Sequence, residues 1–361
     1  MEPHRLTREH ARRVIVRAQL LEADRPGDVV EVAEQIGAIK IDPTAVIAPS
    51  EQAIPWARIG WGYEPGQLTK AVEDDRQLFE YAGSFYPTSM LPAMRVRMRE
   101  RPLRESTAAW LEANSAFRAD VLARLRADGP LLASDIPDTA AVPAGNEGGW
   151  YSDNQVPRML DLLERLGEVA VVGRTGRLRR WDVAERARGP EPDGLTFDDA
   201  GALLDERRLQ GAGLARQKSS WSGVGMAGDP AVVEGSTWKW RVDPRALKAI
   251  DDDSGGRVAI LNPYDGMLFD RPRLVEAFEF AYKLEQFLPK AQRVYGYFAH
   301  PIVCGDRFIG LLDAALDKPK ENLVVAAMHE LLPWEAEERE MVEAEIRDLG
   351  DWLGVPVRGL D

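Results

Sequence analysis

The chain has 361 residues, which is too long for one ordinary hydrophobic core and predicts two or three domains. Its 45% hydrophobic and 29% charged residues are typical of a water-soluble globular protein, and no apolar run is long enough to predict a membrane-spanning helix. The formal net charge of −13, taken alone, argues against a nucleic-acid-binding protein. A single cysteine, Cys304, excludes a disulfide or a cysteine zinc cluster within the chain.

The charge is unevenly distributed. Residues 95–190 contain 16 arginines, no lysine and 14 carboxylates, so this stretch is slightly positive while the rest of the chain is strongly negative. Within it, residues 174–188 hold six arginines against two carboxylates. Such a stretch is either a nucleic-acid contact or an ordinary solvated surface.

Residues 1–105 begin with an expected helix over 7–22, capped by Thr7. A second helix and an extended segment follow in "GDVVEVAEQIGAIKID". Prolines at 43, 49 and 55 predict mostly loop over 43–60. The stretch "PGQLTKAVEDDRQLFEYAG" predicts another helix, and "MLPAMRVRMRERPLRES" is basic.

Residues 106–190 carry the clearest pattern: a helix, a turn, a short helix, and then a helix with Met159, Leu160 and Leu163 on one face. The segment "EVAVVGRTGRLRRWDV" predicts a β-hairpin turning at "GRTGR". This order is typical of a winged helix-turn-helix, which places one helix in the major groove and the hairpin against the DNA backbone. The arginines expected to contact DNA are Arg158, Arg165, Arg174, Arg177, Arg179 and Arg180. The alternative is a small helical domain that binds protein or only packs.

Residues 191–256 predict a similar unit, with "LTFDDAGALLDERRLQ" helical and "STWKWRVDPRAL" forming a strand and a turn. Glycines at 223, 225 and 228 have GxGxxG spacing, but a polar stretch precedes them, so a loop is expected instead of a nucleotide site. Residues 257–361 predict a β-rich portion. It contains a helix in "VEAFEFAYKLEQFL", two strands joined by "CGDR" and a closing acidic helix.

Several catalytic motifs are missing. "HELLP" at His329 lacks the second histidine of a zinc protease motif, and neither a GxSxG nucleophile elbow nor a phosphate-binding P-loop occurs. No residues have the spacing of metal ligands, so we expect neither a metal nor a cofactor, and we expect His300 to be structural.

The most unusual feature is a pair of charges inside the apolar run "IGAIKIDPTAVIAPS". In an extended segment Lys40 and Asp42 point to the same face, and Ile39 and Ile41 to the other. Burying such charges is costly unless they are paired. The spacing alone leaves a structural ion pair and a functional site both open.

Three further stretches are distinctive: an AR-x5-AQ-x-L pattern from Ala11 to Leu21, the segment "IGAIKIDPTAVIAPS" with "WARIGWGY", and "NPYDGMLFDR" with "YKLE" and "YGYFAHPI". In these stretches the chain resembles the bacterial winged-helix DNA glycosylases of AlkZ/YcaQ type, which release alkylated bases and unhook interstrand crosslinks. The likeness is weak in the middle of the chain.

The resemblance implies an α+β fold of tandem winged helix-turn-helix units with a C-terminal β-barrel-like portion. It divides the chain into an N-terminal winged-helix-like domain with the catalytic segment (1–105), a central winged-helix domain (106–190), a third unit (191–256) and a β-rich portion with a closing helix (257–361).

The resemblance also implies hydrolysis of the N-glycosidic bond of alkylated or bulky-adducted purines in double-stranded DNA, with Asp42 as the catalytic carboxylate. Lys40 stands where the family has glutamine. Lys40 is expected either to keep Asp42 ionised or to act as an amine nucleophile that forms a Schiff base with the sugar.

Further DNA contacts are expected from Trp56 as a stacking group, from Arg58 as a phosphate ligand and from Arg271 in the C-terminal motif. For Trp56 and Arg58 the alternatives are core packing and a structural ion pair.

Three functions stay open: a glycosylase in repair or self-resistance, a non-catalytic winged-helix DNA-binding protein, and a winged-helix scaffold for proteins. The N-terminus lacks the apolar core of a signal peptide, so we expect a cytoplasmic protein, and a monomer.

Overall fold

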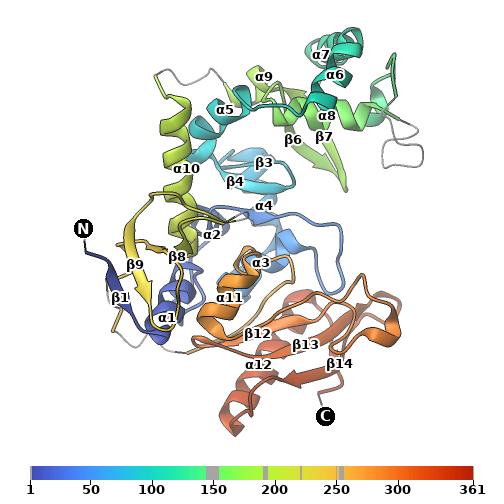
Figure 1. Cartoon of the computed structure of the whole chain (residues 1–361). Helices are drawn as coiled ribbons and strands as arrows, with labels where there is room; N and C mark the ends of the chain where they lie inside the picture. Colours follow the sequence, from blue (N-terminus) through green and yellow to red (C-terminus); the bar gives the residue numbers. More distant parts are fainter. Residues whose placement is uncertain are drawn as a thin grey trace. The chain divides into compact units, whose positions relative to one another are not determined.

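The chain folds into two units whose segments alternate along the sequence. The computed structural model describes residues 2–143, 154–189, 194–219, 222–248, 250–251 and 256–360. The first unit combines Met1–Leu68 with Asp205–Asp361, and the second is Thr69–Leu204. Both contain helices and strands, which confirms the α+β class (Figure 1). The division into four domains does not coincide with these units and stays a prediction; its boundary at 190/191 falls among residues outside the described ones.

The first two helices of the first unit begin at capping side chains, of which the sequence analysis predicts Thr7. Thr7 accepts a hydrogen bond from the His10 N–H at 3.1 Å, and Asp28 accepts two, at 2.8 Å each, from the next helix. The elements up to residue 68 are β1 (His4–Leu6), α1 (Arg8–Ala18), α2 (Val29–Ile36), β2 (Ile39–Lys40), α3 (Ser50–Ile59), the short helix η1 (Gly60–Gly62) and the start of α4 (Pro65–Thr69).

The prediction of loop over 43–60 is wrong for its second half, because α3 is helical through Pro55. Proline removes one helical hydrogen bond and normally ends a helix. Here burial outweighs that cost: Ile54, Trp56 and Ile59 are at most 5% exposed. Tertiary packing therefore decides the structure of this segment, and the local signal does not.

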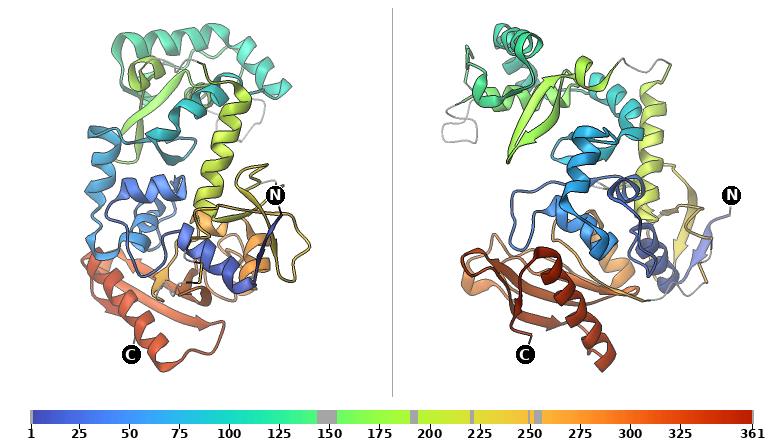
Figure 2. Two further views of the ribbon diagram at one scale, coloured as in Figure 1. Left: turned by 90° about the vertical axis from the view of Figure 1, so that its left-hand side faces the viewer. Right: turned by 180° about the vertical axis from the view of Figure 1, so that it is seen from behind.

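The first unit contains two sheets, whose strands all come from its later part except for β1. A four-stranded sheet has the order β1-β9-β10-β8, and a five-stranded sheet runs β11-β12-β13-β14-β15. Helix α12 lies across one face of the five-stranded sheet (Figures 1 and 2). The elements are α10 (Phe197–Ala212, beginning in the second unit), β8 (Leu214–Arg216), β9 (Asp229–Val233), β10 (Trp240–Val242), β11 (Val258–Ile260), η5 (Gly266–Leu268), α11 (Arg271–Phe278), η6 (Lys290–Gln292), β12 (His300–Cys304), β13 (Arg307–Asp317), η7 (Lys318–Lys320), β14 (Asn322–Glu330), α12 (Ala336–Leu353) and β15 (Val357–Arg358).

Two predictions in this part have different outcomes. The "CGDR" turn between β12 and β13 is confirmed, with Gly305 at a φ of 56°. The helix expected over 275–288 ends at Phe278, and the chain then runs irregularly to β12 apart from η6. The glycines at 223, 225 and 228 lie between β8 and β9, in neither helix nor strand.

The second unit has its helices beside one sheet, in which β4, β3, β6, β7 and β5 follow one another. The apolar face predicted for α8 is confirmed, since Met159, Leu160 and Leu163 are fully buried against Phe117 and Trp181. The remaining elements are the π-helical turn η2 (Lys70–Asp74), β3 (Leu78–Tyr81), β4 (Ser84–Pro87), η3 (Thr88–Met90), α5 (Leu91–Arg99), α6 (Glu105–Ala113), α7 (Ser115–Asp128), β5 (Leu131–Leu132), η4 (Ala133–Asp135), α8 (Val156–Arg165), β6 (Val169–Thr175), β7 (Leu178–Val183) and α9 (Ala184–Arg188).

Two hairpins shape this sheet. The predicted hairpin is confirmed, with β6 and β7 joined through Gly176 and Arg177. The segment 65–83, expected to be one helix, is helical only as far as Asp74. Residues 78–81 of it form β3, which pairs with β4. Ala82 and Gly83 both have positive φ, 47° and 74°, as a tight hairpin turn requires.

A buried ion pair joins distant parts of the first unit. The Arg58 guanidinium donates to both Asp265 carboxylate oxygens at 2.7 and 3.0 Å, and neither side chain is exposed. Arg58 also donates to the backbone and side-chain oxygens of Gln19. Helix α3 is thereby tied to the end of α1 and to the segment before α11.

We expect Arg58→Met to lower the free energy of unfolding by about 3–5 kcal/mol, because it leaves the Asp265 carboxylate buried without a cation. Denaturant unfolding followed by circular dichroism measures the loss. Arg12→Met is the matched control: its ion pair with Asp306, 2.9 Å, is about one quarter exposed, so we expect a cost of at most about 1 kcal/mol. The double variant Arg58→Met/Asp265→Leu should recover part of the loss. Equal losses in Arg58→Met and Arg12→Met would contradict this account.

Candidate active site and DNA-contacting residues

The charged pair lies where β2 ends and an irregular segment begins. Ile39 is fully buried, whereas Lys40, Ile41 and Asp42 are each half-buried. The expected alternation of buried and exposed faces is therefore present between Ile39 and Lys40 only. It does not continue to Ile41 and Asp42, because β2 ends at Lys40.

Two hydrogen bonds hold the segment 40–49 to its surroundings. Ser50, the first residue of α3, is fully buried and donates its hydroxyl to the Lys40 carbonyl at 2.8 Å. The Leu316 N–H, near the end of β13, donates to the Val46 carbonyl at 2.9 Å. The helix that Arg58 anchors and the C-terminal sheet therefore together fix the backbone around Asp42.

The Asp42 side chain is oriented by a backbone N–H group two residues further along the chain. Its Oδ1 accepts the Thr44 N–H at 2.9 Å, which is the hydrogen bond of an Asx turn. Across the residues that the structure describes, no ion pair within 4.0 Å joins Asp42 to Lys40 or to another cation. The structural ion pair that the spacing left open is therefore not formed, and Asp42 presents a half-buried carboxylate oriented by one N–H.

Trp56 and Arg58 are interior residues, which corrects the expectation that they contact DNA. The Trp56 side chain is 2% exposed and stacks on Trp352, with ring centroids 5.5 Å apart. Arg58 is 0% exposed and bonded to Asp265. Core packing and a buried ion pair, the alternatives that the sequence leaves open for them, are what the structure contains.

The six arginines of the second unit that the sequence analysis expects to contact DNA fall into two groups. Most lie within reach of intramolecular partners: Arg174 with Glu80 at 2.7 Å, Arg179 with Asp161 at 2.8 Å, Arg180 with Glu73 at 3.4 Å, and Arg158 over the Trp110 ring at 4.4 Å.

The second group is Arg165, at the end of α8, and Arg177, in the hairpin turn. Both are exposed and form no ion pair with any described residue. These two guanidinium groups are therefore available to a partner without loss of an internal ion pair.

Arg271 is the first residue of α11, in the first unit. Its side chain is exposed, with the guanidinium carbon 6.0 Å from the centre of the Tyr282 ring. The structure leaves it accessible to an external anion.

Glu164 is a buried carboxyl that the sequence analysis missed. It lies on α8 four residues after the buried Leu160, so the helical spacing already places it on the apolar face. It is 2% exposed, and its Oε1 has no hydrogen-bond partner among the described residues. Burial raises the pKa of Glu164 to about 7, partly offset by the Arg179 charge.

The described residues contain no group of three or more His, Cys, Asp or Glu side chains arranged to hold a metal ion. They also contain no helix with the length and apolar character needed to cross a membrane. His300 is fully buried in β12, and burial lowers its pKa to about 4, so the imidazole stays neutral near pH 7.

Comparison with known proteins gives two findings. Residues 33–352 match the family model of the AlkZ-like DNA glycosylases. Among solved structures, DNA glycosylase AlkZ from Streptomyces sahachiroi superposes with a TM-score of 0.64 at 13% sequence identity, covering 98% of this chain and 99% of that one. The second finding is a likeness of fold.

Glu164 makes stability depend on pH. Its pKa of about 7 in the folded protein lies above the usual value of about 4.3 for an unfolded chain. Its contribution is therefore fully present below pH 4.3 and is lost as the pH rises through 7. We expect Glu164→Gln to raise the free energy of unfolding by roughly 1–3 kcal/mol at pH 8 and by much less at pH 5. Denaturant titrations at both pH values measure this. Glu185→Gln removes an exposed carboxylate from the same unit and should show no such difference; an equal effect in both variants would refute the assignment.

Proposed function

The chain belongs to the AlkZ-like DNA glycosylase family, and from this premise we propose that it hydrolyses the N-glycosidic bond of alkylated or bulky-adducted purines in double-stranded DNA. Asp42 is the proposed catalytic carboxylate. The observation that carries the proposal is the half-buried Asp42 carboxylate, oriented by Thr44 and free of an ion pair among the described residues, inside the stretch that the family model covers.

The chemistry suits a lone carboxylate. An N7-alkylated purine already carries positive charge, so it leaves as a neutral base without a strong general acid. As the bond from C1′ to the base breaks, the sugar gains oxocarbenium character, which a nearby carboxylate stabilises. The same carboxylate accepts a proton from the water that adds to C1′. Neither a metal nor a cofactor enters this reaction.

Lys40 has two proposed roles. As an electrostatic partner it helps keep Asp42 ionised, which needs only its position two residues away. As an amine nucleophile its nitrogen would form a bond to C1′ as the bond from C1′ to the base breaks and the base leaves. Opening of the sugar ring, with a proton going to the ring oxygen, would then give a Schiff base between Lys40 and C1′. We favour the electrostatic role, because it requires only a positive charge near Asp42, whereas a nucleophile must also bring its nitrogen into contact with C1′.

We further propose that α7, β5, η4, α8 and the β6–β7 hairpin form a winged helix-turn-helix that binds duplex DNA. The order of elements and the pairing of β5 with β7 support this. Helix α8 would enter the major groove, with Arg165 at its end and Arg177 at the hairpin tip reaching phosphates. We also propose that the chain contains further winged-helix units in tandem and that its C-terminal sheet forms a β-barrel-like portion.

The proposed setting is a cytoplasmic monomer that acts in DNA repair or self-resistance, with interstrand crosslinks as a further substrate. The second candidate function is a winged-helix protein that binds damaged DNA without cleaving a bond. Lys40 favours it, since the carbonyl oxygen of a glutamine can accept a hydrogen bond from a water molecule, whereas an ammonium has only donors.

We expect the protein to release free base from duplex DNA containing N7-methylguanine, and Asp42→Asn to reduce the rate at least about 100-fold, because an amide neither stabilises the cationic sugar nor accepts a proton. Chromatography of the released base measures both rates. Asp74→Asn, a carboxylate in the second unit, is the control and should keep full activity.

Two outcomes would contradict parts of this proposal. Full base release by Asp42→Asn would remove Asp42 from the chemistry. DNA binding by the wild type without release of base from methylated, bulky-adducted or crosslinked duplexes would favour the non-catalytic reading. Borohydride added during turnover separates the roles of Lys40: a covalent protein–DNA species that is absent in Lys40→Gln would establish the nucleophile.

For the DNA contacts, we expect Arg165→Ala and Arg177→Ala each to weaken binding to duplexes of any sequence and to reduce the slope of log affinity against log salt by about 1, since each removes one phosphate contact. Fluorescence anisotropy at several salt concentrations measures this. Arg124→Ala is the control, because Arg124 is an exposed arginine of α7 paired with Asp128. A slope unchanged in all three variants would overturn the assignment.

A further inference from the structure

The segment between α11 and β12 holds apolar side chains out into solvent. Residues 285–297, here called the aromatic loop, include Phe287 at 87%, Val294 at 68% and Tyr297 at 44% exposure. Large apolar groups gathered on one exposed loop are unusual for a surface that faces only water, and such patches mark contact with a partner.

The aromatic loop is held in place by internal hydrogen bonds. The Glu285 carboxylate, 8% exposed, accepts the N–H groups of Val294 and Tyr295 at 2.8 and 2.9 Å. The Gln286 amide donates to the Tyr264 hydroxyl at 2.7 Å. Phe287, the next residue, thus projects from a fixed backbone, so little ordering entropy is lost when it binds.

The charge of the loop points to the class of partner. Residues 285–297 contain two cations, Lys290 and Arg293, and one carboxylate, Glu285, which is buried. The exposed charge is therefore entirely positive, in a chain whose net charge is −13. Aromatic side chains interleaved with cations fit a polyanion that carries flat apolar groups, which is a description of nucleic acid.

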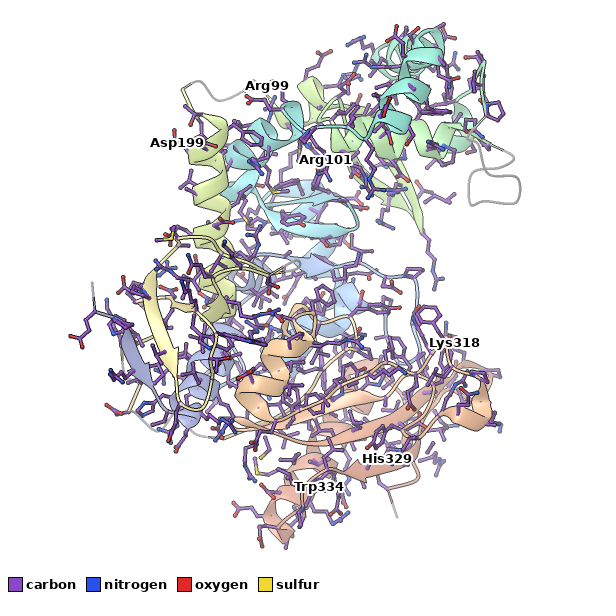
Figure 3. All side chains as sticks on the ribbon, viewed as in Figure 1. Arg99, Arg101, Asp199, Lys318, His329 and Trp334 are labelled. Carbon is purple, nitrogen blue, oxygen red and sulfur yellow. The ribbon has the colours of Figure 1, made fainter. Side chains whose placement is uncertain are left out.

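The aromatic loop and the segment of Asp42 contact the same strand. Tyr295 packs against His329, the β14 residue labelled in Figure 3, with ring centroids 5.4 Å apart, and Gly296 lies directly against Asp313 of β13. The Val46 carbonyl is bonded to Leu316, three residues further along β13. At about 3.4 Å per residue, the two attachment points are roughly 10 Å apart, which is within the span of a few base pairs.

We propose that the aromatic loop is a DNA-contacting element in which Phe287 stacks on a base beside the lesion, while Lys290 and Arg293 contact the flanking phosphates. This inference rests on the proposed function and adds a positioning residue to it. Phe287 holds the duplex open at the damaged nucleotide, next to Asp42, and takes no part in the bond cleavage.

The test uses a duplex with a tetrahydrofuran abasic-site analogue and 2-aminopurine as the neighbouring base. It reports binding by anisotropy and base unstacking by 2-aminopurine fluorescence, and it needs no catalysis. We expect Phe287→Ala to bind roughly 5- to 100-fold more weakly, as loss of one base stack implies, and to lose the fluorescence change. Phe287→Trp should retain both. Because Phe287 is largely exposed, its variants should keep the wild-type melting temperature.

Trp61→Ala is the matched control. Trp61 is as exposed as Phe287, at 88%, but lies in η1 beyond the far end of α3, about 15 Å along the helix from the residue bonded to Lys40. It should bind and unstack like the wild type; an equal loss in Trp61→Ala would overturn the special role of the loop.

The remaining outcomes are distinct. Wild-type affinity and unstacking in Phe287→Ala would overturn this inference and leave base release by Asp42 intact. Failure of the wild type to bind any duplex would overturn both proposals. A change in oligomeric state on Phe287→Ala, measured by sedimentation and without effect on DNA binding, would assign the loop to a second copy of the chain.

Discussion

The buried ion pair between Arg58 and Asp265 is the constraint on which the proposed active site depends. Neither residue is exposed, so each charge is tolerated only because the other is present. Gln19 completes the arrangement by accepting two further hydrogen bonds from Arg58. The three residues come from the three stretches that carry the family likeness, so this ion pair and its hydrogen bonds join those stretches in the folded chain.

These hydrogen bonds, together with those to residues 40 and 46, explain how a short irregular segment acquires a defined geometry. Arg58 holds α3, the first residue of α3 holds the carbonyl of Lys40, and β13 holds Val46 from the other side. Asp42 lies between these attachments and is turned by Thr44. A catalytic carboxylate needs such pre-organisation, because a displacement of about 1 Å already costs much of the rate. The aromatic loop contacts the same strand, so the proposed DNA-contacting loop and the proposed catalytic segment are both attached to β13.

The sequence predicts local structure best where one residue determines the backbone. Thr7 begins α1, Gly305 turns β12 into β13, and the glycine turn at 176 closes a hairpin as expected. It fails where distant contacts outweigh local preference. Pro55 predicts a break in a segment that packing keeps helical. Arg58 reads as a phosphate ligand because Asp265, its partner, is 207 residues away in the sequence. The sequence singles out Asp42 and Lys40 as candidate site residues, which stays a prediction, but it leaves open whether the two form an ion pair.

The proposed mechanism requires the carboxylate of Asp42 to face the sugar of the damaged nucleotide. The most direct measurement is a crystal structure of Asp42→Asn bound to a duplex that carries N7-methylguanine on a stabilised 2′-fluoro sugar. We expect the side chain of residue 42 within about 4 Å of C1′, the distance at which a reacting group can act, with the segment 39–49 against the damaged strand. DNA bound on another surface, with residue 42 turned away from the sugar, would contradict it.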